Sequence, residues 1–113
     1  MRSSFNMAET NITMVKGDTL SFNFQIEGLD GGDLSSAYFT VKANPKGNLA
    51  LIQKSIGNGI SKVDEGLYVV RVAPDDTENL DAGMLWYDLQ IGIGEDIYTV
   101  LLGMLEILQD VTN

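Results

Sequence analysis

The chain has 113 residues, of which 44% are hydrophobic and 20% charged, and its net charge is −9. This length predicts one domain with its own core, and the apolar content excludes a disordered tail. The negative charge argues against binding to nucleic-acid phosphates or to an anionic membrane surface. The absence of cysteine excludes disulfides and thiolate metal sites.

We expect the N-terminal residues to differ from the rest of the chain. Residues 1–9 are polar and aperiodic, so we expect a flexible N-terminal arm that is either disordered or ordered against a neighbouring subunit. We expect residues 10–113 to form a single domain. The first seven residues lack the apolar run of a signal peptide, so no secretion signal is predicted. The longest apolar run, residues 100–105, is too short to span a bilayer as a helix.

Apolar and polar residues alternate through most of the domain, which is the pattern of half-buried β-strands. The clearest stretch is 19–27, where Leu20, Phe22, Phe24 and Ile26 share one face. Further strands are predicted at 10–15, 36–43, 49–55, 67–73, 84–93 and 97–108. The side chains predicted to point inward from the later strands are Ala37, Phe39, Val41, Tyr68, Val70, Val72, Leu85, Tyr87, Leu89, Ile91 and Ile93.

This succession of short strands and turns predicts an all-β fold. We interpret it as an immunoglobulin-like antiparallel β-sandwich of about seven strands, with a closed barrel as the alternative that periodicity does not separate. Asp64, Gly66 and Tyr68 have the spacing of a tyrosine corner, in which the hydroxyl bonds to loop backbone. An antibody-type domain is excluded, because there are no cysteines to pair and Trp86 follows this corner.

The predicted last strand, 97–108, is apolar on both faces. A two-layer sandwich buries only one face of a strand. Either a bulge at Gly103 switches the buried face midway, or another chain covers the second face. The candidate interface on this second face consists of Tyr98, Val100, Leu102, Met104 and Leu108.

The chain lacks most of the groups that enzymes use. It contains no histidine and no cysteine, and no serine lies in a nucleophile elbow. Catalysis by a carboxylate pair stays open, but such chemistry needs a cleft that a domain of this size rarely provides. We therefore expect no enzyme, no catalytic residue and no cofactor.

The acidic crossover at residues 75–81 is the one cluster of candidate metal ligands. Its carboxylates are those of Asp75, Asp76, Glu78 and Asp81. Their spacing matches no calcium loop, and aspartates at the start of a helix commonly cap it. We interpret the cluster as capping of one helical turn at 77–80 by Asp75 or Asp76, and predict no metal site.

Several short stretches spread over residues 10–112 together resemble a known family. They are Ile12-Thr13-Met14, Lys16-Gly17-Asp18-Thr19, residues 36–42, Gly66-x-Tyr68, Val70-x-Val72-x-Pro74-x-Asp76-Thr77, Leu80-x-Ala82-Gly83, residues 87–90, and the terminal segments 105–107 and 109–111. On these stretches the chain resembles immunoglobulin-like modules of tailed-phage and prophage structural gene clusters, similar to the N-terminal domain of phage baseplate upper proteins.

The resemblance implies a non-enzymatic structural module of the virion tail or baseplate, assembled in the cytoplasm of the host bacterium. It would act by protein–protein contacts with other virion proteins and with copies of itself. The alternative hypothesis is a module that binds carbohydrate or the host surface. In that case Trp86 and Tyr38, which alternation places on the outer face, would stack on the ligand.

Overall fold

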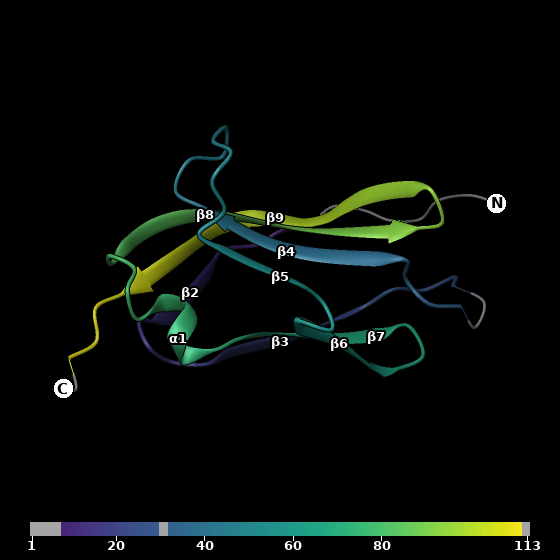
Figure 1. Cartoon of the computed structure of the whole chain (residues 1–113), viewed down its shortest axis with the longest axis horizontal. Helices are drawn as coiled ribbons and strands as arrows, with labels where there is room; N and C mark the ends of the chain where they lie inside the picture. The colour runs from purple at the N-terminus through teal and green to yellow at the C-terminus, as the bar shows by residue number, and fades with distance from the viewer. Residues whose placement is uncertain (1–7, 30–31, 112–113) are drawn as a thin grey trace.

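The computed structural model describes residues 8–29 and 32–111, and nearly all regular structure within these ranges is β-strand (Figure 1). The prediction of an all-β fold is therefore confirmed. The described residues form nine strands and one short helix: β1 (Ala8–Glu9), β2 (Ile12–Val15), β3 (Leu20–Gln25), β4 (Ser36–Lys42), β5 (Ile52–Ile56), β6 (Gly59–Asp64), β7 (Leu67–Val72), α1 (Pro74–Thr77), β8 (Gly83–Ile93) and β9 (Asp96–Leu108).

The strands form one hydrogen-bonded path that folds over into two layers. Its order is β1-β9-β8-β4-β5-β6-β7-β3, and β2 also pairs with β9. In Figure 1, β4, β8 and β9 lie on one side of the molecule and β3, β6 and β7 on the other. The chain crosses between the layers at the corner from β5 to β6. There Gly57 and Gly59 have φ angles of 87° and 97°, a left-handed region that other residues rarely adopt.

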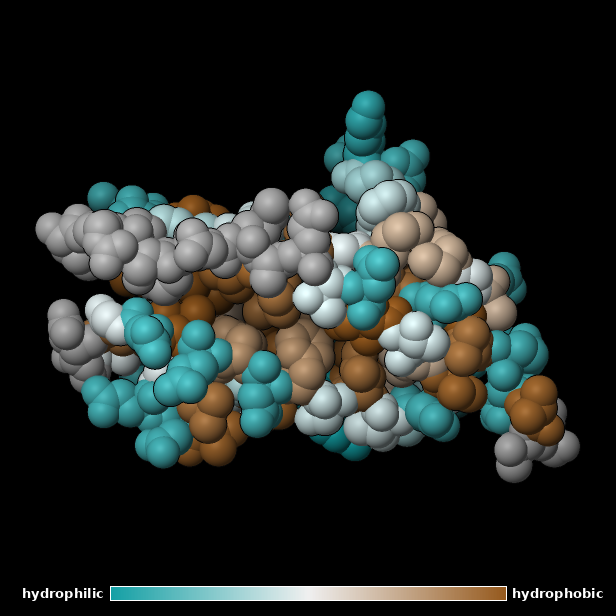
Figure 2. All heavy atoms as spheres, turned by 180° about the vertical axis from the view of Figure 1, so that it is seen from behind, coloured by the Kyte–Doolittle hydropathy of each residue, from teal (hydrophilic) through white to brown (hydrophobic). Residues whose placement is uncertain are grey.

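The core lies between the two layers and is centred on Phe39 of β4, which is fully buried. Its ring centroid lies 5.5 Å from that of Phe22 in the opposite layer and 5.5 Å from that of Tyr87 in β8. The inward residues predicted for β4, β7 and β8 are buried, except that Ile93 is only partly buried against the core. Seen from behind, apolar side chains gather along the middle of the molecule (Figure 2).

The predicted inward face of β3 is only half-buried. Leu20, Phe22 and Phe24 pack against the core without being fully covered, whereas Ile26, just beyond the strand, is buried. The reason is that β3 is the last strand of the path, and no other strand of the described residues pairs with its second edge.

The number and pairing of the strands differ from the prediction of about seven antiparallel strands. Among the described residues, three of the pairs are parallel: β1–β9, β2–β9 and β5–β6. Alternation does not reveal β6, because Ile60 is its only buried residue. The predicted arm of residues 1–9 ends in β1, and its residues 1–7 lie outside the described residues.

The predicted bulge in β9 exists, but at Val100 and not at Gly103. Thr99 pairs with Gln90 and Leu101 pairs with Leu89, so Val100 is an extra residue opposite the shift in register. An extra residue reverses the alternation of side chains beyond it. This reversal lets β9 bury residues from both of its sequence registers in the same core.

Gly103 instead makes room for the N-terminal strands. A β-carbon at this position would overlap the carbonyl oxygen of Thr10, in the link between β1 and β2. That carbonyl accepts a hydrogen bond of 2.6 Å from the Tyr87 hydroxyl, and the Thr10 N–H donates to the Leu102 carbonyl at 3.1 Å. The glycine therefore lets the link pass directly over β9.

Tyr68 anchors a loop, although not as a tyrosine corner. Its hydroxyl accepts a buried hydrogen bond of 3.0 Å from the N–H of Leu34, which lies 34 residues earlier. A tyrosine corner instead bonds to backbone a few residues upstream. The predicted bond to loop backbone is therefore present, but its partner is the loop that leads into β4.

The acidic crossover contains α1, one turn earlier than predicted. Asp76 accepts a hydrogen bond of 2.7 Å from the N–H of Ala73 and pairs with Lys54 of β5 at 2.8 Å. The buried Thr77 accepts a hydrogen bond of 2.8 Å from the N–H of Gly17. These contacts tie the crossover to both layers.

No helix in the described ranges is long and apolar enough to cross a membrane.

Replacing Gly103 by alanine tests the passage of the N-terminal link over β9. We expect Gly103→Ala to displace the link around Thr10, and to lower the free energy of unfolding by about 1–3 kcal/mol, the usual cost of overpacking. Chemical denaturation measures the cost, and hydrogen exchange of β2 amides measures the displacement.

The matched control is Gly47→Ala in an exposed turn, where a β-carbon would lie 3.3 Å from the Asn44 carbonyl oxygen. It should change stability by about 0.5 kcal/mol or less. Equal effects of the two substitutions would contradict the close approach at Gly103.

Candidate functional site

Large apolar side chains form a contiguous stripe on the outer face of β8 and β9. Trp86 pairs with Met104, and their neighbours on the same face include Met84 and Leu102. Met84 is 48% exposed, Trp86 38%, Leu102 38% and Leu108 40%, while Met104 is half-buried. We call these five residues the outer stripe: Met84, Trp86, Leu102, Met104 and Leu108.

The outer stripe groups several exposed apolar side chains on one face of two adjacent strands. Single apolar residues are common on protein surfaces, but contiguous patches usually mark an interaction site. Along β9 the stripe runs from Leu102 to Leu108, which is about 20 Å of strand. Glu106 and Asp88 are the charged residues of this face on the same two strands.

Two residues of the predicted interface, Tyr98 and Val100, do not belong to the outer stripe. Tyr98 pairs with the buried Ile91 and therefore points toward the core, and Val100 is the bulge residue. Both pack, partly buried, against the core. The physical reason is the bulge: it reverses the faces on its two sides, so the face of Leu102, Met104 and Leu108 does not continue through Tyr98.

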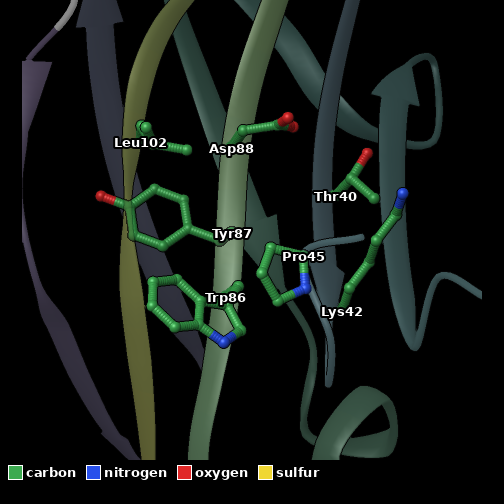
Figure 3. A pocket seen from close by; sticks show the side chains of 7 residues that line it. All are labelled: Thr40, Lys42, Pro45, Trp86, Tyr87, Asp88 and Leu102. Carbon is green, nitrogen blue, oxygen red and sulfur yellow. The ribbon is translucent and has the colours of Figure 1, made fainter. Parts of the chain in front are cut away.

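A small pocket of about 110 Å³ adjoins the stripe on the β4 side. Figure 3 shows Leu102 and the Trp86 indole on the β9 side of β8, with the side chains of Thr40 and Lys42 on the β4 side. The β4–β8 register brings these residues together by pairing Thr40 with Asp88 and Lys42 with Trp86. The pocket lining is completed by Pro45, from the turn after β4, and by Tyr87.

Asp88 and Lys42 are the two charged groups that line this pocket. Asp88 forms no ion pair with another described residue. Burial raises the pKa of its carboxyl above the ordinary value of 3.8, and the positive charge of Lys42 offsets this only in part. The Lys42 ammonium donates a hydrogen bond of 3.0 Å to the Gly47 carbonyl, which holds the turn that carries Pro45.

The two predicted stacking residues lie on the same outer face but not in the same pocket. Trp86 lines the pocket, whereas Tyr38 lies two residues before Thr40 on β4, is 43% exposed and is not part of the lining. Sequence reasoning did not select Thr40, Lys42, Pro45 or Asp88. In the sequence, the only indication of these pocket residues was the polar face of β8. Their proximity to one another depends on the register between β4 and β8, which the sequence does not reveal.

The described residues show no cluster suited to metal binding. Within 8–29 and 32–111, no group of three or more acidic side chains is arranged to hold an ion. Asp76 of the acidic crossover instead bonds to Ala73 and Lys54.

No family model and no curated protein matches the chain. Among solved structures, a segment of an endo-fucoidan hydrolase of glycoside hydrolase family 107 is similar, with a TM-score of 0.52, 13% identity, and coverage of 91% of this chain and 13% of that one. A Bacteroides vulgatus protein assigned as a glycoside hydrolase gives a TM-score of 0.50 at 16% identity, covering 89% of this chain and 17% of that one.

A third structure, the ZIG-8–RIG-5 IG1–IG1 heterodimer, gives a TM-score of 0.49 at 16% identity, with coverage of 95% and 90%. The identities are low throughout, so the likeness to the hydrolase segments concerns the fold alone. The chain spans less than a fifth of the length of either hydrolase.

The substitution Asp88→Asn tests the burial of this carboxyl. Because the folded-state pKa is raised, the folded protein is most favoured when the group is protonated, and stability is lost as the pH rises through that pKa. We expect Asp88→Asn to raise the Tm at about pH 7, and this gain to vanish at about pH 3, where both states are protonated.

Thermal unfolding at the two pH values measures this difference. Asp96→Asn, at the exposed turn between β8 and β9, is the matched control and should show little gain at either pH. A loss of stability in Asp88→Asn at neutral pH would show that the carboxylate is stabilised, not desolvated, in the folded protein.

Proposed function

We propose that the protein is a non-enzymatic assembly module that acts through protein–protein contacts of the outer stripe. The observation that carries the proposal is the exposure of four large apolar side chains on adjacent strands, with the half-buried Met104 on the same face. Burying apolar surface yields about 25 cal/mol per Å², so covering such a stripe favours association. The core already occupies the other face of these strands, so the stripe is the face that they offer to a partner.

We further infer that the two layers are the sheets of an immunoglobulin-like sandwich. In this interpretation β3 to β9 are its seven principal strands, and β1 and β2 are additional strands along β9. The single turn of helix between β7 and β8 connects the two layers. The support is the arrangement of the pairs: β8 lies between β4 and β9, and β7 lies between β3 and β6.

The phage part of the proposal rests on the sequence resemblance. We propose that the module belongs to the tail or baseplate of a tailed phage or prophage, assembles in the host cytoplasm, and contacts copies of itself and other virion proteins. Two of the matching stretches meet in space, since the N–H of Gly17 donates to the Thr77 hydroxyl. In this chain, that hydrogen bond joins two of the stretches on which the resemblance rests.

A charge placed in the outer stripe tests this proposal. We expect Leu108→Asp to weaken self-association by about 30-fold, the effect of losing a hot spot worth about 2 kcal/mol. Sedimentation over a range of concentrations measures the change. Val63→Asp is the matched control, because Val63 is exposed on β6 in the other layer, and it should associate like the unmodified chain.

Cross-linking in purified phage particles extends the test to other virion proteins. A strict monomer at high concentration, with no cross-linked neighbour in particles, would overturn the proposal. Association that Val63→Asp disrupts and Leu108→Asp does not would place the interface on the opposite layer.

A further inference from the structure

The pocket beside the outer stripe combines an aromatic wall with a carboxylate. Trp86 and Leu102 lie on the β9 side of β8, and the Asp88 carboxylate extends toward Thr40 on the β4 side, where Pro45 and Lys42 also line the pocket (Figure 3). It is part of the surface that the assembly proposal assigns to a partner. The chemistry of its lining therefore bears on what that partner presents.

The size of the pocket favours one side chain over a free small molecule. Its volume is about 110 Å³. Sites for small-molecule ligands usually have about 300–1,000 Å³. The pocket is therefore too small to enclose such a ligand, but it has room for the end of one long side chain.

The Asp88 carboxylate favours a cation as the occupant. Asp88 forms no ion pair with another described residue, and the ammonium of Lys42, which also lines the pocket, donates a hydrogen bond to the Gly47 carbonyl. A guanidinium group pairs with a carboxylate through two parallel hydrogen bonds and stacks on an aromatic face, so Asp88 and Trp86 offer both of its preferred contacts. The net charge of −9 attracts a basic partner over longer distances.

We propose that this pocket receives an arginine side chain of the protein that covers the outer stripe, with its guanidinium paired to Asp88 and stacked against Trp86. The inference rests on the proposed assembly function and names the chemistry of the partner. The partner presents a basic residue at the centre of an apolar contact surface. Such aromatic and arginine pairs are the typical hot spots of protein interfaces.

The test is a titration of the isolated chain with N-acetyl-arginine amide, observed by NMR. The indole N–H of the single tryptophan and the backbone amide of Asp88 are the reporters. N-acetyl-glutamine amide, glucose and galactose are the comparison probes. We expect a saturable shift of both reporters with the arginine probe alone.

Asp88→Asn should weaken binding of the arginine probe about tenfold, corresponding to ~1.4 kcal/mol for the lost charge pair. Asp96→Asn removes an exposed carboxylate outside the pocket and should leave the binding unchanged. An equal response to the glutamine probe, no saturable response to the arginine probe, or no effect of Asp88→Asn would each overturn the inference. Shifts with a sugar and not with arginine would overturn it in favour of carbohydrate binding.

Leu108→Asp separates this inference from the assembly proposal. It alters the stripe about 13 Å along β9 from Met104, the residue that pairs with Trp86, so arginine binding should persist when self-association is lost. If the chain assembles but does not bind the arginine probe, the arginine assignment fails and the assembly proposal stands. If it binds the probe but neither self-associates nor has neighbours in particles, the assembly proposal fails.

Discussion

The pairing of β9 on both of its edges is the constraint on which the rest of the structure depends. One edge bonds to β8, and the other bonds to β1 and β2 in parallel. Where both edges are occupied, along residues 101–108, β9 cannot extend the sheet by adding a strand from another chain. Its exposed outer face is then the part of the strand left for contacts, and the bulge at Val100 decides which side chains reach that face. The outer stripe follows directly from this geometry.

Alternation in the sequence predicted the inward faces of β4, β7 and β8 well, because a two-fold period reports directly on which side chains meet the core. It did not predict the parallel strands or the position of the bulge. Gly103 looked like a bulge glycine, but its lack of a side chain serves the passage of Thr10, which is 93 positions away. Such a requirement comes from a tertiary contact, and a local pattern does not contain it.

The candidate site shows the same division between local and long-range information. The outward direction of Trp86, Leu102 and Met104 could be predicted from alternation along single strands. The pocket could not, because Thr40, Lys42 and Asp88 meet only through the register of β4 on β8. The same register leaves Asp88 partly desolvated beside Trp86, and places its carboxylate next to the apolar surface. In physical terms the stripe would supply affinity, and the carboxylate would supply selectivity among partners.

Quenching of Trp86 fluorescence by acrylamide tests the central claim most directly, that another chain covers the outer stripe. Trp86 is the only tryptophan, so the signal reports on this surface alone. The account predicts ready quenching in the dilute chain, where the indole is 38% exposed, and marked protection as the chain self-associates or enters particles. Unchanged quenching while the assembly grows in mass would contradict it, because the interface would then lie elsewhere.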